Sequence, residues 1–344
     1  MKLASRKRMG IWATASLCLL LAARLVAAAP TEADLHAHAR ALARASAAVV
    51  GVHAVAVEDA VTIDVLGRER LGSGVVIDAD GLVLTIGYLI VEAEHVDLVL
   101  AAEHVVPARV VAYDPASGFG LLQGLVPVRL PAAPLGQSSS ITADEPLLIV
   151  SGGEDANLSL ASMVSRRAFT GSWEYHIDGA LFTTPPRIDH SGAALFNADG
   201  ELLGIGSLLV SDAQGPGAMP MAGNMFVPVD LLKPILRELR ERGASRSSAR
   251  AWLGMNCMER NGVVRVLRPT RDSPADEAGL RPGDLIVRID GVDVTGLEQL
   301  YKTLWRGDTP ERKVTLDIVR DGMPQTFTLR SRDRIKTLRR PQGI

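Results

Sequence analysis

The sequence predicts a mainly β protein that ends in a smaller α+β domain. Between residues 49 and 210, short runs rich in β-branched residues follow one another, and each is closed by Gly, Asp, Pro or a Glu-His pair. This spacing is typical of an all-β sandwich or barrel. From residue 252 onward strand-like and helix-like runs alternate, which indicates a second domain. A chain of 344 residues accommodates both domains and a targeting segment.

The first domain is expected to begin with an alanine-rich helix over 30–48. Its expected strands are 49–57, 61–65, 74–77, 82–85, 96–100, 105–112, 147–150, 158–164, 176–182 and 202–210. A helix capped by Asp230 and ended by Gly243 follows. Residues 243–250 are polar and carry no apolar stripe, so we interpret them as a linker.

Composition argues against a nucleic-acid partner. The formal net charge is -2, and only 4% of the residues are aromatic, so neither a basic surface nor a base-stacking surface is expected. The histidines and cysteines show no metal-ligand spacing, and no metal site is expected.

Residues 1–29 have the pattern of a secretory signal. Basic residues precede an apolar run over 11–23, and small residues end the segment at 27–29. Pro30 disfavours cleavage directly after Ala29, so retention as a membrane anchor stays open beside cleavage. Either outcome predicts an exported, periplasmic location.

Four stretches of the first domain resemble the HtrA/Deg family of trypsin-like serine proteases. They are residues 72–85 (GSGVVIDADGLVLT), 108–115 (ARVVAYDP), 183–200 (TTPPRIDHSGAALFNADG) and 225–229 (MFVPV). The resemblance implies a trypsin-like double β-barrel over 30–242, with Ser191 as the nucleophile and no cofactor.

The other catalytic positions depart from the family pattern. Tyr88 stands in the slot of the general-base histidine, and Gly118 stands in the slot of the aspartate. Asp189 replaces the oxyanion-hole glycine and would bring a negative charge close to where another develops. Serine needs an adjacent base, and a tyrosine with a pKa of about 10 does not supply one at neutral pH. His190 adjoins Ser191, but adjacent side chains in a tight turn point apart, so we do not expect it to replace that base.

Residues 273–286 (SPADEAGLRPGDLI) resemble a PDZ domain of the HtrA arrangement, which implies a domain over 251–333. Such domains bind peptides by strand addition and hold the terminal carboxylate with backbone N–H groups. The resemblance gives those groups to Leu253, Gly254 and Met255, and the groove wall to Leu300 and Leu304. We expect Leu297 and Tyr301 in the core, and a disordered tail over 331–344, with 334–344 as its basic end.

Three functions remain open. The first is an exported pseudoprotease that binds peptides, acts as a scaffold or regulates through its PDZ domain. The second is an active HtrA-type serine endopeptidase that serves protein quality control in the cell envelope. The third is a chaperone-like holdase. All three have peptides or unfolded proteins as partners, bound through their C-terminal residues, and all three leave room for a homo-oligomer.

Overall fold

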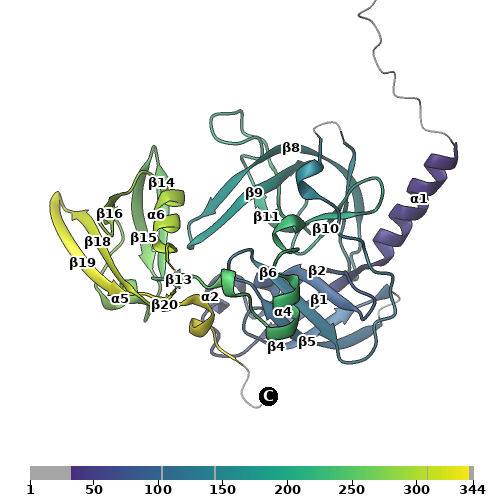
Figure 1. The fold of residues 1–344 in the computed structure, drawn as a ribbon, viewed down its shortest axis with the longest axis horizontal. Coiled ribbons are helices and arrows are strands. Elements are labelled where there is room, and N and C mark those ends of the chain that lie inside the picture. The colour runs from purple at the N-terminus through teal and green to yellow at the C-terminus, as the bar shows by residue number, and fades with distance from the viewer. Residues whose placement is uncertain (1–31, 102–103, 143–144, 308, 341–344) are drawn as a thin grey trace, which may run out of the picture. The chain divides into compact units, whose positions relative to one another are not determined.

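A computed structural model describes residues 32–101, 104–142, 145–307 and 309–340 (Figure 1). Among the described residues, 38–340 belong to one compact unit. The expected signal segment 1–29 lies outside the described residues. Within the described ranges, no helix is long and apolar enough to cross a membrane.

The first part of this unit is a closed barrel of antiparallel strands in the order β1-β2-β3-β6-β5-β4. Alternate residues of each strand face its interior, as Val50, Val52 and Ala54 do in the first strand. The strands are β1 (Val49–Ala56), β2 (Glu69–Val76), β3 (Leu82–Ile86), β4 (Ala93–Val99), β5 (Val105–Tyr113) and β6 (Phe119–Gly124).

A second closed barrel follows, in the order β10-β11-β12-β9-β8-β7. Its strands are β7 (Leu147–Val150), β8 (Leu158–Gly171), β9 (Tyr175–Thr184), β10 (Ala194–Phe196), β11 (Leu202–Val210) and β12 (Gly223–Pro228). The two barrels confirm the predicted mainly β fold. The hairpin of β8 and β9 is long, with strands of 14 and 10 residues, and residues 172–174 form its tip.

Three details of the sequence analysis of this domain are wrong, two at helices and one at a strand. The helices are α1 (Glu32–Ala47), α2 (Ile63–Leu66), α3 (Gly87–Ile90) and α4 (Leu236–Arg242). Residues 61–65 were expected as a strand, but Thr62 donates from its backbone and its hydroxyl to Glu92, which holds this segment in a turn that leads into α2. Asp230 does not cap α4 and instead accepts from the backbone of Ser139. Strand β6 was not predicted, because Gly120 and Gly124 dilute its apolar pattern.

The C-terminal domain is an antiparallel sheet with two helices. The sheet order is β14-β15-β16-β18-β19, and β17 pairs with β16. The elements are β14 (Met255–Arg260), β15 (Val263–Pro269), α5 (Pro274–Glu277), β16 (Leu285–Ile289), β17 (Val292–Asp293), α6 (Leu297–Leu304), β18 (Lys313–Arg320) and β19 (Met323–Arg330). The Ser273 side chain caps α5 by accepting from the backbone of Asp276. At the start of α6, the side chain of Glu259 accepts from the backbone of Leu297.

The expected disorder of the tail is wrong for its described part. Strand β20 (Arg332–Asp333) pairs with β13 (Ala251–Trp252), and a 3-10 helix (Arg334–Thr337) follows. The Asp333 side chain caps this helix by accepting from the backbone of Ile335. The pairing partner lies about eighty residues upstream, so no local periodicity marks this segment as ordered.

Candidate active site and peptide-binding groove

Ser191 lies in the turn between β9 and β10, and its backbone fixes this turn against the first barrel. The Ser191 carbonyl accepts from the backbone of Ser73 at 2.8 Å, and the Gly192 backbone donates to the Gly206 carbonyl at 2.9 Å. Gly192 has φ 73°, a conformation that favours glycine. A β-carbon there would lie 2.0 Å from the Ser73 carbonyl oxygen. The loop is therefore held in one position by backbone contacts that leave no room for a side chain.

Tyr88, on α3, faces Ser191. Its hydroxyl lies 2.8 Å from the Ser191 Oγ and 2.8 Å from the Ser207 carbonyl oxygen. A phenol has one proton and a carbonyl can only accept, so Ser191 can donate to the Tyr88 oxygen whenever the phenol donates to Ser207. Burial raises the pKa of Tyr88 to about 12, and its hydrogen bond with Ser191 acts in the opposite direction. The group beside Ser191 is therefore a neutral phenol at physiological pH.

Gly118 borders Tyr175, which fills the space on its side-chain face. A β-carbon on Gly118 would lie 2.8 Å from the Tyr175 hydroxyl oxygen, and the φ of 79° again favours glycine. The Tyr175 hydroxyl donates to the Ser117 carbonyl at 2.8 Å. Burial raises the pKa of Tyr175 well above its usual value. The slot that the sequence analysis assigned to an aspartate therefore holds a neutral tyrosine tip.

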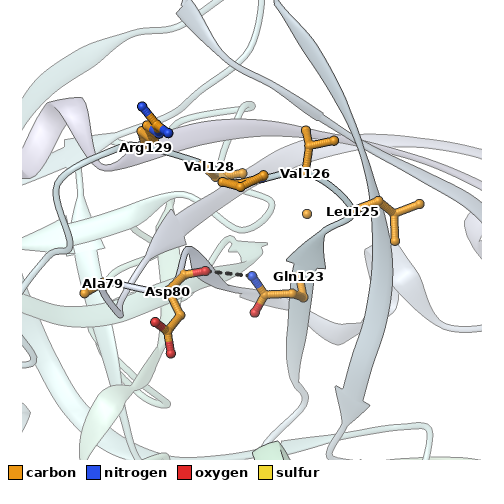
Figure 2. Close-up of a pocket in the computed structure, with 9 residues that line it drawn as sticks. Ala79, Asp80, Gln123, Leu125, Val126, Val128 and Arg129 are labelled. Carbon is orange, nitrogen blue, oxygen red and sulfur yellow. Dashed lines mark hydrogen bonds between the residues drawn. The ribbon is translucent and has the colours of Figure 1, made fainter.

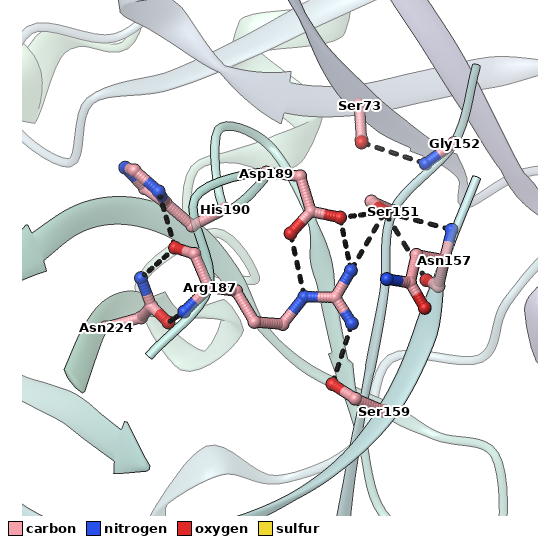
Figure 3. A network of polar contacts seen from close by, with 9 residues as sticks. All are labelled: Ser73, Ser151, Gly152, Asn157, Ser159, Arg187, Asp189, His190 and Asn224. Atoms are coloured by element: carbon pink, nitrogen blue, oxygen red, sulfur yellow. Dashed lines mark hydrogen bonds and ion pairs between the residues drawn. The ribbon is translucent and has the colours of Figure 1, made fainter. Parts of the chain in front are cut away.

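Asp189 is balanced by Arg187, which the sequence analysis did not select (Figure 3). The Arg187 Nε donates to one carboxylate oxygen of Asp189 at 2.8 Å, and its Nη2 forms an ion pair with the other. The Ser151 hydroxyl also donates to Asp189, at 2.6 Å. Burial opposes ionisation of Asp189, but the hydrogen bonds from Arg187 and Ser151 prevail and lower its pKa. The negative charge expected at Asp189 is therefore present, and it is paired with the guanidinium of Arg187.

The histidine beside Ser191 is turned into its own loop. The His190 Nδ1 lies 3.1 Å from the Arg187 carbonyl oxygen (Figure 3), and burial lowers the pKa of His190. In the described residues no hydrogen bond joins it to Ser191.

One group of side chains has ligand atoms within 4.8 Å of one another, namely His176, Asp178 and Glu298. The Lys302 ammonium donates to Asp178 at 3.3 Å and to Glu298 at 2.7 Å. Lys302 thus pairs with both carboxylates of the group, and we interpret the group as an ion-pair network.

The expected carboxylate-binding loop meets a carboxylate of the same chain. The backbones of Leu253 and Met255 donate to the two side-chain oxygens of Glu174 at 3.1 and 2.8 Å. Leu300 and Leu304 are fully buried among the core side chains of the C-terminal domain, together with Tyr301. The sequence analysis missed Glu174, because nothing around it in the sequence distinguishes it from a hairpin residue.

A shallow pocket lies elsewhere on the first barrel (Figure 2). Its rim includes Asp80, Gln123 and Arg129, and the Gln123 side chain donates to the Asp80 carbonyl at 2.8 Å. Neither Tyr88 nor Ser191 lines it, so it takes no part in the candidate active site.

Comparisons with known proteins agree with these two domains. A family model of the trypsin-like peptidase domain matches residues 72–205, and a PDZ domain model matches residues 251–330. The chain is 29% identical over 276 residues to a "Probable periplasmic serine endoprotease DegP-like" of Ectopseudomonas mendocina strain ymp, covering 74% of this chain and 56% of the relative. It is 28% identical over 257 residues to "Putative protease Do-like 14" of Arabidopsis thaliana, covering 66% and 58%. The chain thus spans about half the length of these curated relatives.

Solved structures share the fold. The HtrA-type protease AlgW with tripeptide superposes with a TM-score of 0.53 at 22% identity, covering 88% of this chain and 98% of that chain. The serine endoprotease from Yersinia pestis gives a TM-score of 0.53 at 20% identity, covering 86% and 97%. The chain therefore has a trypsin-like peptidase domain followed by a PDZ domain, and its fold resembles that of HtrA-type proteases.

Proposed function

We propose that this protein is an exported, HtrA-like pseudoprotease that binds peptides through its PDZ domain and uses the double barrel as a scaffold. The observation that carries the proposal is the contact between Tyr88 and Ser191. Acyl transfer by serine needs a base that removes the hydroxyl proton and a carboxylate that orients the base. With a pKa of about 12, Tyr88 is ionised to only about one part in 10⁵ at pH 7.

The surroundings of Ser191 support the same conclusion. Tyr175 fills the space at Gly118, and His190 faces the Arg187 carbonyl. Loss of the base from a serine triad reduces turnover by about 10⁶-fold. Export is proposed on the basis of the signal-like segment 1–29 and of relatives named as periplasmic.

The runner-up is an endopeptidase that activates Ser191 in another way, and a fluorophosphonate probe separates the two. The probe reacts with activated serines, so the purified chain is expected to label no more than its Ser191→Ala variant. A serine protease of known activity at equal concentration serves as the positive control. Stoichiometric labelling that disappears in Ser191→Ala would overturn the pseudoprotease proposal. The proposal that the PDZ domain binds peptides would not be affected.

A further inference from the structure

The hairpin of β8 and β9 enters the groove of the PDZ domain in the manner of a peptide ligand. Ser172 lies two residues before Glu174, and its carbonyl accepts from the backbone of Cys257 at 2.8 Å. Cys257 in turn lies two residues after Met255 on β14. This backbone bond and the bonds of the Glu174 side chain to Leu253 and Met255 lie along the edge of β14, the kind of sheet edge to which such domains add a peptide. The Tyr301 hydroxyl on α6 also donates to the Ser172 carbonyl, at 3.0 Å, so the tip meets both walls of the groove.

The Glu174 side chain completes the resemblance to a peptide terminus. Both of its oxygens accept from backbone N–H groups of the loop that binds a terminal carboxylate in such domains. Glu174 is 8% exposed, so the pair of hydrogen bonds is shielded from water. Burial raises the pKa of this carboxyl, while Arg334 and the backbone N–H groups of the loop act in the opposite direction. A buried carboxylate with these partners matches the charge-assisted geometry of a bound C-terminus.

The backbone at the tip is adapted to this contact. Glu174 has φ 56°, in the left-handed region that non-glycine residues seldom adopt. A turn at this position would favour glycine or asparagine, so the hydrogen bonds of the glutamate offset the strain of its backbone. Trp173 and Tyr175 flank it with stacked rings, 5.8 Å between centroids, and Tyr175 anchors the tip to Ser117.

We infer that the β8–β9 tip is an internal ligand that occludes the PDZ groove, so that a protein C-terminus binds only by displacing Glu174. Because the tip is tethered, it competes at an effective concentration of the order of millimolar. The groove is therefore closed to weak peptide ligands and open to strong or locally concentrated ones. The inference rests on the peptide-binding half of the proposed function.

The test measures peptide affinity on the full chain. The probe is a fluorescently labelled decapeptide that ends in leucine with a free carboxylate, followed by fluorescence anisotropy. Glu174→Gln and Glu174→Ala should each tighten binding by about tenfold to a hundredfold, because the loop loses its charged internal ligand. Glu241→Gln, the same chemical change at an exposed site on α4, should leave affinity unchanged. Amidation of the peptide should weaken its binding to every variant.

A second readout monitors the tip directly. Trp173 is 39% exposed and stacked on Tyr175, so displacement of the tip should change its fluorescence when peptide saturates the wild-type chain. Trp173→Phe should abolish that change. If Glu174→Gln and Glu174→Ala bind with wild-type affinity while amidation still weakens binding, internal occlusion is wrong and peptide binding stands. If no variant binds the peptide, the peptide-binding function fails and the inference fails with it.

Discussion

The Ser191 site and the PDZ groove are both occupied by the protein itself, but in different ways. At Ser191, the occupying group is Tyr88, a residue of the site whose side chain cannot act as the base. In the groove, the Leu253 and Met255 donors are intact, and Glu174 of a distant hairpin covers them. On the proposed function, the first site lacks a base because of a change of residue type, whereas the second keeps its backbone donors behind a group that a ligand can displace. The proposals therefore predict that a peptide ligand can open the groove but cannot activate Ser191.

The largest expected effect concerns the rigidity of the Ser191 loop. Gly192→Ala combines a left-handed φ with a β-carbon 2.0 Å from the Ser73 carbonyl oxygen, and should lower the free energy of unfolding by about 3 kcal/mol or more. The matched control is Gly179→Ala, where φ is 66° and nothing lies within 4 Å of the added carbon. The Gly179→Ala control should lower the free energy of unfolding by only about 1–2 kcal/mol. Urea unfolding of the full chain measures both, and equal costs would mean that the loop shifts freely.

An intermediate effect is expected for Tyr88→Phe. The variant leaves the carbonyl of the buried residue Ser207 without its phenol donor and should lower the free energy of unfolding by about 1–2 kcal/mol. Ser191→Ala keeps the hydrogen bond between Tyr88 and the Ser207 carbonyl, and it should lower the free energy of unfolding by less than about 1 kcal/mol. If Ser191→Ala proves the costlier of the two, the serine and not Ser207 is the main partner of the phenol.

The same pair of proteins gives a pH dependence. The folded-state pKa of Tyr88, about 12, lies above its ordinary value of about 10. The folded chain therefore keeps a proton that the unfolded chain releases, and this stabilisation is complete below pH 10 and lost as the pH rises from 10 to 12. The stability difference between wild type and Tyr88→Phe should be constant from pH 7 to 9 and shrink above pH 10. A difference that instead grows between pH 8 and pH 10 would mean that the folded chain releases the Tyr88 proton before the unfolded chain does, so that Tyr88 ionises easily and could act as a base.

The smallest expected effect lies at the rim of the groove. Lys302 pairs with Asp178 and Glu298, and all three side chains are about half exposed or more. Lys302→Met should change the free energy of unfolding by less than about 1 kcal/mol, and the change should vanish in high salt. Peptide affinity should change less than in Glu174→Gln. A larger gain in affinity for Lys302→Met would assign the closure of the groove to the rim charges and not to Glu174.

The sequence by itself determined the fold class and which residues stand in the candidate active site. The β-branched runs and turn residues are local signals, and they predicted most strands of both barrels. The motif around Ser191 and the departures from the family pattern at Tyr88 and Gly118 can likewise be seen from the residue types alone. The error at 61–65 arose because a distant side chain holds the backbone there, as Glu92 does at Thr62.

Only the tertiary structure decided what occupies each site. Arg187 forms an ion pair with Asp189 because of the conformation of their loop, and no sequence pattern predicts that conformation. Tyr175 reaches Ser117 over 58 positions of sequence, and Glu174 reaches Leu253 over 79. Hydrogen bonds between such positions depend on the register of β8 with β9 and on the path of the chain between the domains. Local propensity carries no information on either, because contacts between residues so far apart in the chain are set by the tertiary structure and not by neighbouring residues.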